Sequence, residues 1–277
     1  MKAEEEFLLF SDGGSDQGQN AAGACIVRLP QTNKESRIIV YLGPGTNNEA
    51  EISAGLAGFS LLQVIGEKSP AKRGVRWLCD SEYTLKSATS YIHAWQKNGW
   101  KTAAKSPVKN QGLWRAFLAL SADLSITPEH VYGHSGHVEN ELCDAAVCWA
   151  RSCAAAQLES CGEGLIEPSS IGQDGWLLID GRQFIAKMRA AEFGEPEKEA
   201  CSLIADKLRA LGVSWVEVGN GSIQRTAKNH RSKNSTGLET LQSKLKDAYQ
   251  FASQLPQRGP ELEEITAGLA ELLQKCK

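Results

Sequence analysis

Short apolar runs separated by turn residues dominate the first part of the chain. Three of them follow one another closely and predict a meander of three strands, at Phe7–Phe10, Ala21–Leu29 and Arg37–Leu42. Two further short runs predict single strands, at Val75–Cys79 and His130–Tyr132. A sheet of five strands is therefore expected.

Helical spacing of apolar residues fills the segments between the later strands. The first such segment follows the Gly- and Asn-rich stretch before residue 48, and Ile52, Leu56 and Phe59 recur along it. The predicted helices cover about 48–65, 81–98, 110–123 and 138–159. The order of elements indicates an α/β fold, a mixed five-stranded sheet flanked by helices.

A shift in composition marks a boundary after this first domain, which we place at residues 1–160. Residues 161–175 are rich in Gly, Ser and Pro and are expected to be a linker. Residues 176–277 then predict a smaller α/β (α+β) domain. It contains a strand, a pair of helices and two more strands, and its leucine repeats beyond residue 238 predict a closing helical hairpin.

Composition restricts the class of protein. The chain has 277 residues, 42% of them hydrophobic and 23% charged, as in a soluble globular protein. It has no run of the roughly 18–20 apolar residues that a membrane helix needs, and its acidic N-terminus does not resemble a signal peptide. We therefore expect a cytoplasmic protein without a membrane partner. The eight cysteines form no CxxC pair, so reduced thiols are favoured over a zinc site.

Four acidic residues lie at strand ends and near helix starts. They are Asp12, Glu51, Asp80 and Asp144. Each one alone is better explained as a turn former or as a partner of a helix dipole. If the strands are neighbours, however, Asp12 and Asp80 emerge at adjacent positions, and the two helices can bring Glu51 and Asp144 to the same place. Such a cluster needs cations as counterions. Oxygen ligands suit Mg²⁺ or Mn²⁺, and a pair of such ions acts on phosphodiesters.

Longer motifs around these acids resemble the type 1 ribonuclease H family. They are SDGGS, TNNEAE, CDSEYTLKSAT and GHSGHVENELCDAA, and the stretch YIHAWQKNGWKTAAKSPVKNQGLW is also similar. The resemblance extends in order from Ser11 to Ala150. It implies the ribonuclease H fold, two bound Mg²⁺ ions with Mn²⁺ as a substitute, and an RNA–DNA hybrid as substrate.

The same resemblance implies roles for individual residues. Asp12, Glu51, Asp80 and Asp144 match the family's metal ligands, and His134 matches its loop histidine, which assists proton transfer or product release. Without the family, His134 is equally well explained as a surface residue. Further matches contact the nucleic acid: Asn47 and Asn48 beside Glu51, Thr46 and Asn110 at the DNA phosphate, and Tyr83 and Tyr91 in the DNA channel.

A basic segment free of acidic residues runs from Tyr83 to Ala122. It resembles the basic protrusion of the family, which follows the DNA strand, and its expected contacts are Trp95, Lys97, Trp100, Lys101, Lys105 and Lys109. Three residues depart from the family pattern: Gly14, Glu82 and Tyr132. Glu82 adds negative charge near the substrate and puts the efficiency of cleavage in doubt, but no metal ligand is replaced.

The predicted activity is hydrolysis of the RNA strand of RNA–DNA hybrids, giving 5′-phosphate and 3′-hydroxyl ends. Two alternatives stay open, a non-catalytic hybrid-binding protein and another nuclease of the wider superfamily. The second domain has no recognised motif. Its expected role is self-association through the leucine repeats, a second nucleic-acid contact through Arg225, Lys228, Arg231 and Lys233, or a stabilising cap.

Overall fold

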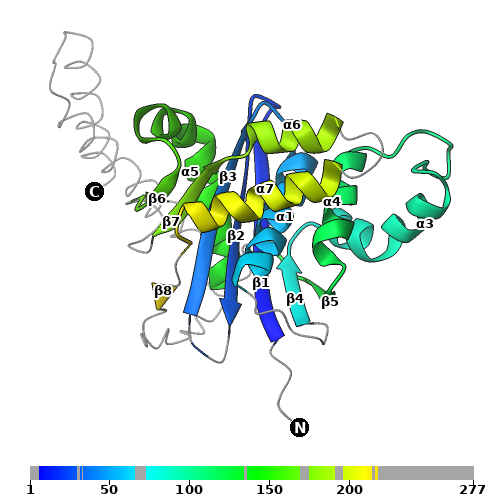
Figure 1. Ribbon diagram of the computed structural model, residues 1–277, viewed down its shortest axis with the longest axis horizontal. Helices are drawn as coiled ribbons and strands as arrows, with labels where there is room; N and C mark the ends of the chain where they lie inside the picture. Colours follow the sequence, from blue (N-terminus) through cyan, green and yellow to red (C-terminus); the bar gives the residue numbers. More distant parts are fainter. Residues whose placement is uncertain are drawn as a thin grey trace, which may run out of the picture. The chain divides into compact units, whose positions relative to one another are not determined.

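The computed structural model describes residues 6–29, 32, 34–65, 73–133, 136–168, 175–190, 196–213 and 216–217 (Figure 1). The chain divides into two compact units, Met1–Gly219 and Asn220–Lys277, and every described residue belongs to the first. Three of the predicted features lie outside the described ranges: His134, the basic segment Arg225–Lys233 and the expected hairpin.

An eight-stranded mixed sheet organises the first unit. Five of its strands have the order β5-β4-β1-β2-β3, with β1 to β3 in an antiparallel meander and β4 and β5 parallel to β1. Their bounds are β1 Glu6–Asp16, β2 Asn20–Leu29, β3 Lys34–Gly43, β4 Arg73–Cys79 and β5 Leu124–His130. The predicted mixed five-stranded sheet is confirmed.

Strand β1 continues beyond the end that the apolar run predicts. Its pairing with β2 extends to Asp16 opposite Asn20, whereas its pairing with parallel β4 stops at Ser11 opposite Cys79. Asp12 therefore lies within β1, at the level where β4 ends. Because parallel strands advance together, Asp12 of β1 lies next to Asp80, the first residue after β4.

Strand β5 lies earlier than predicted. The expected strand at His130–Tyr132 is wrong, because β5 ends at His130 and pairs with β4 from Leu124 onward. Its sequence contains Pro128 opposite Trp77, and proline has no N–H to donate to a neighbouring strand. β5 pairs only with β4, at the edge of the sheet, where such a residue is tolerated.

Helices cover both faces of the sheet (Figure 1). Helices α1 (Asn47–Ile65) and α4 (Gln111–Ser121) pack on one face, and α5 (Val138–Cys161) packs on the other. Helix α1 lies so close to the sheet that a Cβ atom at Gly55 would lie 2.6 Å from a ring carbon of Trp77. This close contact fixes the start of α1, and with it Glu51, relative to β1 and β4.

The helix predicted over residues 81–98 is divided. Helix α2 (Glu82–Lys86) passes into a π-helical turn, η1 (Ser87–Tyr91), and then into α3 (Ile92–Lys97). We call residues 82–110, including the loop that leads to α4, the handle. Its α3 end projects sideways from the sheet (Figure 1).

Residues 163–217 extend the same sheet instead of forming a separate domain. Strand β7 (Trp176–Asp180) pairs in parallel with β3, β6 (Gly164–Ile166) pairs with β7, and β8 (Val216–Glu217) pairs with the start of β3. The expected boundary at residues 161–175 therefore lies within one compact unit, which extends to Gly219. The physical reason is the free edge of β3, which the apolar strand β7 covers.

Two helices complete this extension. Helices α6 (Arg182–Ala190) and α7 (Pro196–Ala210) pack on α4, and α7 also packs on α1. Ile185, Met188, Ile204 and Leu208 join the hydrophobic core on that face. The predicted pair of helices is confirmed in position, and it forms a second layer outside α1 and α4 (Figure 1).

Candidate active site

One pocket gathers all four predicted carboxylates. Asp12, Glu51, Asp80 and Asp144 line it together, and its volume is about 270 Å³. The remaining lining residues come from the β1 end, the start of α1, the β5–α5 loop and α5: Gly13, Gly14, Ser15, Asn47, Gly133, Asn140, Glu141, Val147 and Arg151. The acids are thus brought together from two strand ends and two helices.

Asp12 is the carboxylate at the centre of this arrangement. It is 7% exposed, and its Oδ1 accepts a hydrogen bond of 2.7 Å from the Gly13 N–H. Burial raises the pKa of Asp12 from 3.8 to about 7, and the negative charges of Asp80 and Asp144 add to the rise. The Gly13 hydrogen bond and the Arg151 guanidinium act in the opposite direction. A nearby cation would relieve this unfavourable charge.

Glu51 lies close to Asp12 because the residue after Asp12, where β1 contacts α1, is a glycine. A Cβ atom at Gly13 would lie 2.2 Å from the backbone nitrogen of Glu51, so no larger residue fits between β1 and α1. Burial, and then the charges of Asp12 and Asp80, raise the pKa of Glu51 well above its usual value. Its Oε2 lies 3.7 Å from the Cys79 Sγ.

Asp80 follows β4 and is held through its backbone. Its carbonyl oxygen lies 3.0 Å from the His130 Nε2, and the next residue, Ser81, caps α2 by accepting from the Thr84 N–H. Potential ligand atoms of Glu51, Cys79 and Asp80 lie within 4.8 Å of one another. Burial raises the pKa of the Cys79 thiol well above its usual value, so the available ligands are carboxylate oxygens.

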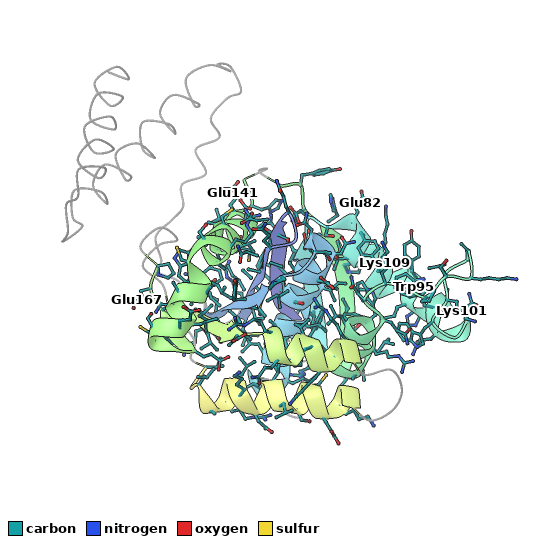
Figure 2. The ribbon with its side chains drawn as sticks, turned by 90° about the horizontal axis from the view of Figure 1, so that it is seen from above. Glu82, Trp95, Lys101, Lys109, Glu141 and Glu167 are labelled. Atoms are coloured by element: carbon teal, nitrogen blue, oxygen red, sulfur yellow. The ribbon has the colours of Figure 1, made fainter. Side chains whose placement is uncertain are left out.

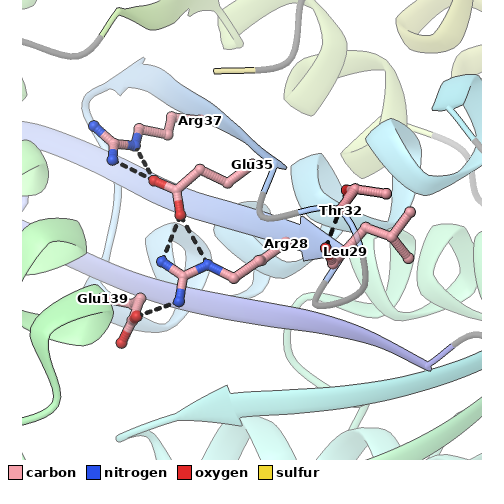
Figure 3. Close-up of polar contacts among 6 residues, drawn as sticks. All are labelled: Arg28, Leu29, Thr32, Glu35, Arg37 and Glu139. Atoms are coloured by element: carbon pink, nitrogen blue, oxygen red, sulfur yellow. Dashed lines mark hydrogen bonds and ion pairs between the residues drawn. The ribbon is translucent and has the colours of Figure 1, made fainter. Parts of the chain in front are cut away.

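Asp144 is placed by α5, which a buried ion-pair network holds against the sheet. Glu35 is fully buried in β3 and accepts from Arg28 at 2.6 Å and from Arg37 at 2.6 Å (Figure 3). Arg28 also donates to Glu139 in the first turn of α5 at 2.5 Å (Figure 3). Asp144 lies on the same helix, just over one turn later, so this network orients the helix that presents it.

Three polar residues of α5 that the sequence did not indicate also line the pocket: Asn140, Glu141 and Arg151. Asn140 is 3% exposed, and its Oδ1 has no hydrogen-bond partner within the part of the chain that the structure describes. An unpartnered buried oxygen beside four carboxylates fits an oxygen-liganded cation or its bound water. Helical spacing from Asp144 could have indicated Asn140 and Arg151, which lie four and seven residues away.

The loop of His134 begins and ends at the pocket. A Cβ atom at Gly133 would lie 3.3 Å from the Asp80 Oδ2, and the Gly136 N–H donates to the Glu141 Oε1 at 3.1 Å. His134 itself is outside the described residues. Its assignment stays a prediction, although both described ends of its loop lie next to the carboxylates.

The predicted contacts at the start of α1 are exposed and lie beside the pocket. Asn47 lines the pocket, and Thr46 and Asn48 are exposed next to it. Thr46 and Glu49 form a capping box: the Thr46 N–H donates to the Glu49 Oε2 at 2.7 Å, and the Glu49 N–H donates to the Thr46 Oγ1 at 3.3 Å. Asn110 precedes α4 in a left-handed conformation with φ of 57°.

Aromatic and basic residues of the handle have different roles in the structure. Tyr83, Trp95 and Trp100 are partly buried and pack against the core, and Trp95 lies 6.0 Å from both Tyr91 and Trp114 between ring centroids. The four predicted lysines are exposed: Lys97, Lys101, Lys105 and Lys109. Figure 2 shows two of them, Lys101 and Lys109, on the handle. The aromatic residues therefore anchor the handle, and the lysines and Tyr91 remain available to a ligand.

The departures from the family pattern are also placed. Glu82 is exposed (Figure 2). It forms an ion pair with Lys86 one turn later, so its charge is locally compensated. Tyr132 is 74% exposed and lies edge-on against His130. Gly14 faces Arg151, since a Cβ atom there would lie 3.2 Å from the Arg151 Nη1. Among the described helices, none is long and apolar enough to cross a membrane.

Comparisons with known proteins agree with this geometry. The RNase H family profile matches residues 4–151, more than half of the chain. A ribonuclease H of Treponema pallidum is 42% identical over 173 residues, 58% of this chain and 99% of that protein. A ribonuclease H of Zymomonas mobilis is 36% identical over 141 residues, 51% of this chain and 86% of that protein.

A solved structure, that of LC9-RNase H1, covers 72% of this chain and 87% of its own at 19% identity, with a TM-score of 0.44. That similarity is too low to support an inference. The family profile and the long matches to ribonucleases H show that this chain belongs to the RNase H family.

Proposed function

We propose that this protein is an endonuclease that hydrolyses the RNA strand of RNA–DNA hybrids, leaving 5′-phosphate and 3′-hydroxyl ends. The observation that carries the proposal is the single pocket in which four carboxylates of a ribonuclease H family member meet. Two of these carboxylates, Asp12 and Glu51, are buried, and the other two are partly buried. Such a cluster destabilises a fold, which makes a purely structural or hybrid-binding role a poor explanation for it.

Asp12, Glu51, Asp80 and Asp144 would hold divalent cations, and we propose two Mg²⁺ ions, with Mn²⁺ as a substitute. The donor set fits because it consists of hard oxygen ligands. Burial and neighbouring negative charges also raise the pKa values of two of them, Asp12 and Glu51, and a bound cation would offset this unfavourable charge. When bound, such ions activate a water molecule and stabilise the leaving oxygen of a phosphodiester.

The protein's own groups orient this site and the substrate. The Gly13 N–H fixes one oxygen of Asp12 and leaves the other for a ligand. Asn47 lies in the pocket and Asn48 beside it, where their amides suit the 2′-hydroxyls of the RNA strand. Thr46 and Asn110 are proposed to bind the DNA backbone, and His134 to assist proton transfer or product release.

Exposed lysines of the handle extend the same substrate surface. Lys97, Lys101, Lys105 and Lys109 are proposed to follow DNA phosphates, together with the exposed ring of Tyr91. The seven described cysteines form no disulfide, which suits the reducing cytoplasm where we expect the enzyme to act.

Cleavage of labelled duplexes tests the proposal. RNA–DNA, RNA–RNA and DNA–DNA substrates are incubated with Mg²⁺ or with EDTA, and only the hybrid with Mg²⁺ should be cut. Asp12→Asn and Asp80→Asn should abolish cleavage while leaving the circular dichroism spectrum unchanged. Asp206→Asn is the matched control, because Asp206 is 72% exposed on α7 and should not affect the rate.

The alternatives give other results in the same assay. Binding of the hybrid without cleavage under any metal would favour the non-catalytic protein. Cutting of DNA duplexes at a rate similar to that of hybrids would favour another nuclease of the superfamily. Wild-type rates for Asp12→Asn would contradict the assignment of the metal ligands.

A further inference from the structure

Helix α6 belongs to the extension beyond the RNase H match, yet it ends at the start of α4. A Cβ atom at Gly112, in the first turn of α4, would lie 1.7 Å from the Met188 carbonyl oxygen and 3.2 Å from the Arg189 Cα. The other end of α6 is fixed at β3, since the Gly181 N–H donates to the backbone carbonyl oxygen of Tyr41 at 2.9 Å. The position of α6 is therefore determined at both ends by backbone contacts.

Arg189 lies between the two segments that hold Thr46 and Asn110. Its Cα is next to Gly112, two residues beyond Asn110, and its Nη2 lies 3.0 Å from the Glu49 Oε1. The other oxygen of Glu49 accepts from the Thr46 N–H. One carboxylate thus joins Arg189 to the capping box in which Thr46 is held.

The guanidinium is well placed for a ligand from solvent. The Arg189 side chain is 39% exposed, and guanidinium has five N–H donors in a planar arrangement that matches phosphate oxygens. Helix α6 also carries Arg182 and Lys187 and has no acidic residue. In addition, the pair with Glu49 cancels a negative charge that would repel a phosphate beside Thr46.

We propose that Arg189 of α6 binds a DNA-strand phosphate of the hybrid, beside Thr46 and Asn110. This inference rests on the proposed function and gives the extension a direct part in substrate binding. A purely structural role is the alternative, in which Arg189 only attaches α6 to α1. The Arg189 side chain is 39% exposed and that of Glu49 is 16% exposed, so water screens the pair on the Arg189 side. Such a pair alone stabilises a fold little, which makes that alternative the weaker one.

Two substitutions separate these explanations because they remove the same ion pair from opposite sides. Arg189→Ala removes the cation, whereas Glu49→Gln leaves it in place and keeps a side chain that suits the capping box. If Arg189 binds phosphate, Arg189→Ala weakens hybrid binding and Glu49→Gln leaves it equal or tighter. If Arg189 is only an attachment, both variants weaken binding to the same extent.

Binding is measured by fluorescence anisotropy of a labelled hybrid in Ca²⁺, so the result does not depend on cleavage. We expect Arg189→Ala to raise the Kd about tenfold, as for one charge-assisted contact, and to reduce the slope of log Kd against log salt by about 0.9. Arg189→Lys should fall between wild type and Arg189→Ala. Arg209→Ala on α7 is the matched control, since it also removes one exposed, paired cation, and it should leave the Kd unchanged.

A phosphate scan locates the contact. Hybrids carry a single neutral methylphosphonate at successive positions of the DNA strand. One position should weaken wild-type binding but leave Arg189→Ala unaffected. Identical scans for the two proteins, or an unchanged Kd and salt slope in Arg189→Ala, would overturn the inference while hybrid cleavage still stands. A wild-type protein that does not bind the hybrid at all would overturn both proposals.

Discussion

Substitution of Asp12 by Asn should stabilise the metal-free protein, and the gain should depend on pH. The asparagine Oδ1 retains the hydrogen bond from the Gly13 N–H, but the side chain has no charge. Burial and the neighbouring carboxylates raise the pKa of Asp12 from 3.8 to about 7. The folded protein therefore binds the Asp12 proton more tightly than the unfolded chain does.

The sign of the effect follows from this difference. Stability that depends on a protonated Asp12 is fully present below about pH 4 and is lost as the pH rises to about 7. At about 1.4 kcal/mol for each tenfold change, the loss is at most about 4 kcal/mol at pH 8. The buried amide of asparagine must also lose its hydration, so we expect a net gain of about 2 kcal/mol for Asp12→Asn at pH 8 and almost none at pH 4.5.

Urea unfolding in EDTA, followed by tryptophan fluorescence between pH 4.5 and pH 8, measures this gain. Asp206→Asn is again the control and should follow the wild type at every pH. Added Mg²⁺ should stabilise the wild type by binding to its folded state and should act much less on Asp12→Asn. A gain of equal size at pH 4.5 and pH 8, or a loss at pH 8, would refute the claim that the ionised carboxylate of Asp12 destabilises the folded protein.

Three further predictions concern the scaffold of the site. Glu35→Gln should lower the free energy of unfolding by about 3–5 kcal/mol, because it leaves the buried Arg37 and the partly buried Arg28 without their shared carboxylate. Glu129→Gln at an exposed pair should change it by less than about 0.5 kcal/mol, and equal effects of the two variants in urea unfolding would contradict this. Gly55→Ala should destabilise by about 1–3 kcal/mol through the contact with Trp77, and a neutral result in the same assay would show that α1 can move away from the sheet. A chain that ends at Cys161 should aggregate or unfold at lower temperature than one that ends at Gly219, since it exposes the edge of β3 and the outer faces of α1 and α4; equal thermal midpoints would oppose this view of the extension.

The sequence predicts much of the fold from local patterns. The strands of the meander, β4 and the helices α1, α4 and α5 have the apolar spacing that their burial requires. These patterns do not predict strand β5, because Pro128 and the charged Glu129 interrupt its apolar run. Such residues are tolerated there because β5 pairs with only one of the described strands. The patterns also do not predict the length of β1, because pairing with β2, and not the apolar run, determines where β1 ends.

The candidate site shows the same division between local and nonlocal information. Each of its four acids has an ordinary explanation in its own segment, and only the parallel register of β1 and β4 places Asp12 beside Asp80. The family resemblance replaces that missing information for the acids, but it says nothing of Arg151 or Asn140. These two residues belong to the pocket because α5 packs on the sheet, where Arg28 joins Glu139 in its first turn to Glu35 of β3.

The extension is the part in which local patterns are least informative. The run WLLI predicts a buried strand, but nothing within it specifies β3 as the partner, since the pairing joins residues about 140 positions apart. Once β7 is paired in parallel with β3, the chain leaves the sheet at Gly181 on the same side as the start of α1, because parallel strands end at the same edge. Helix α6 must then begin beside Gly43 and, with Gly112 allowing close contact, end beside α4. The strand that covers an open sheet edge therefore also determines that Arg189 lies beside Glu49 of α1 and the start of α4.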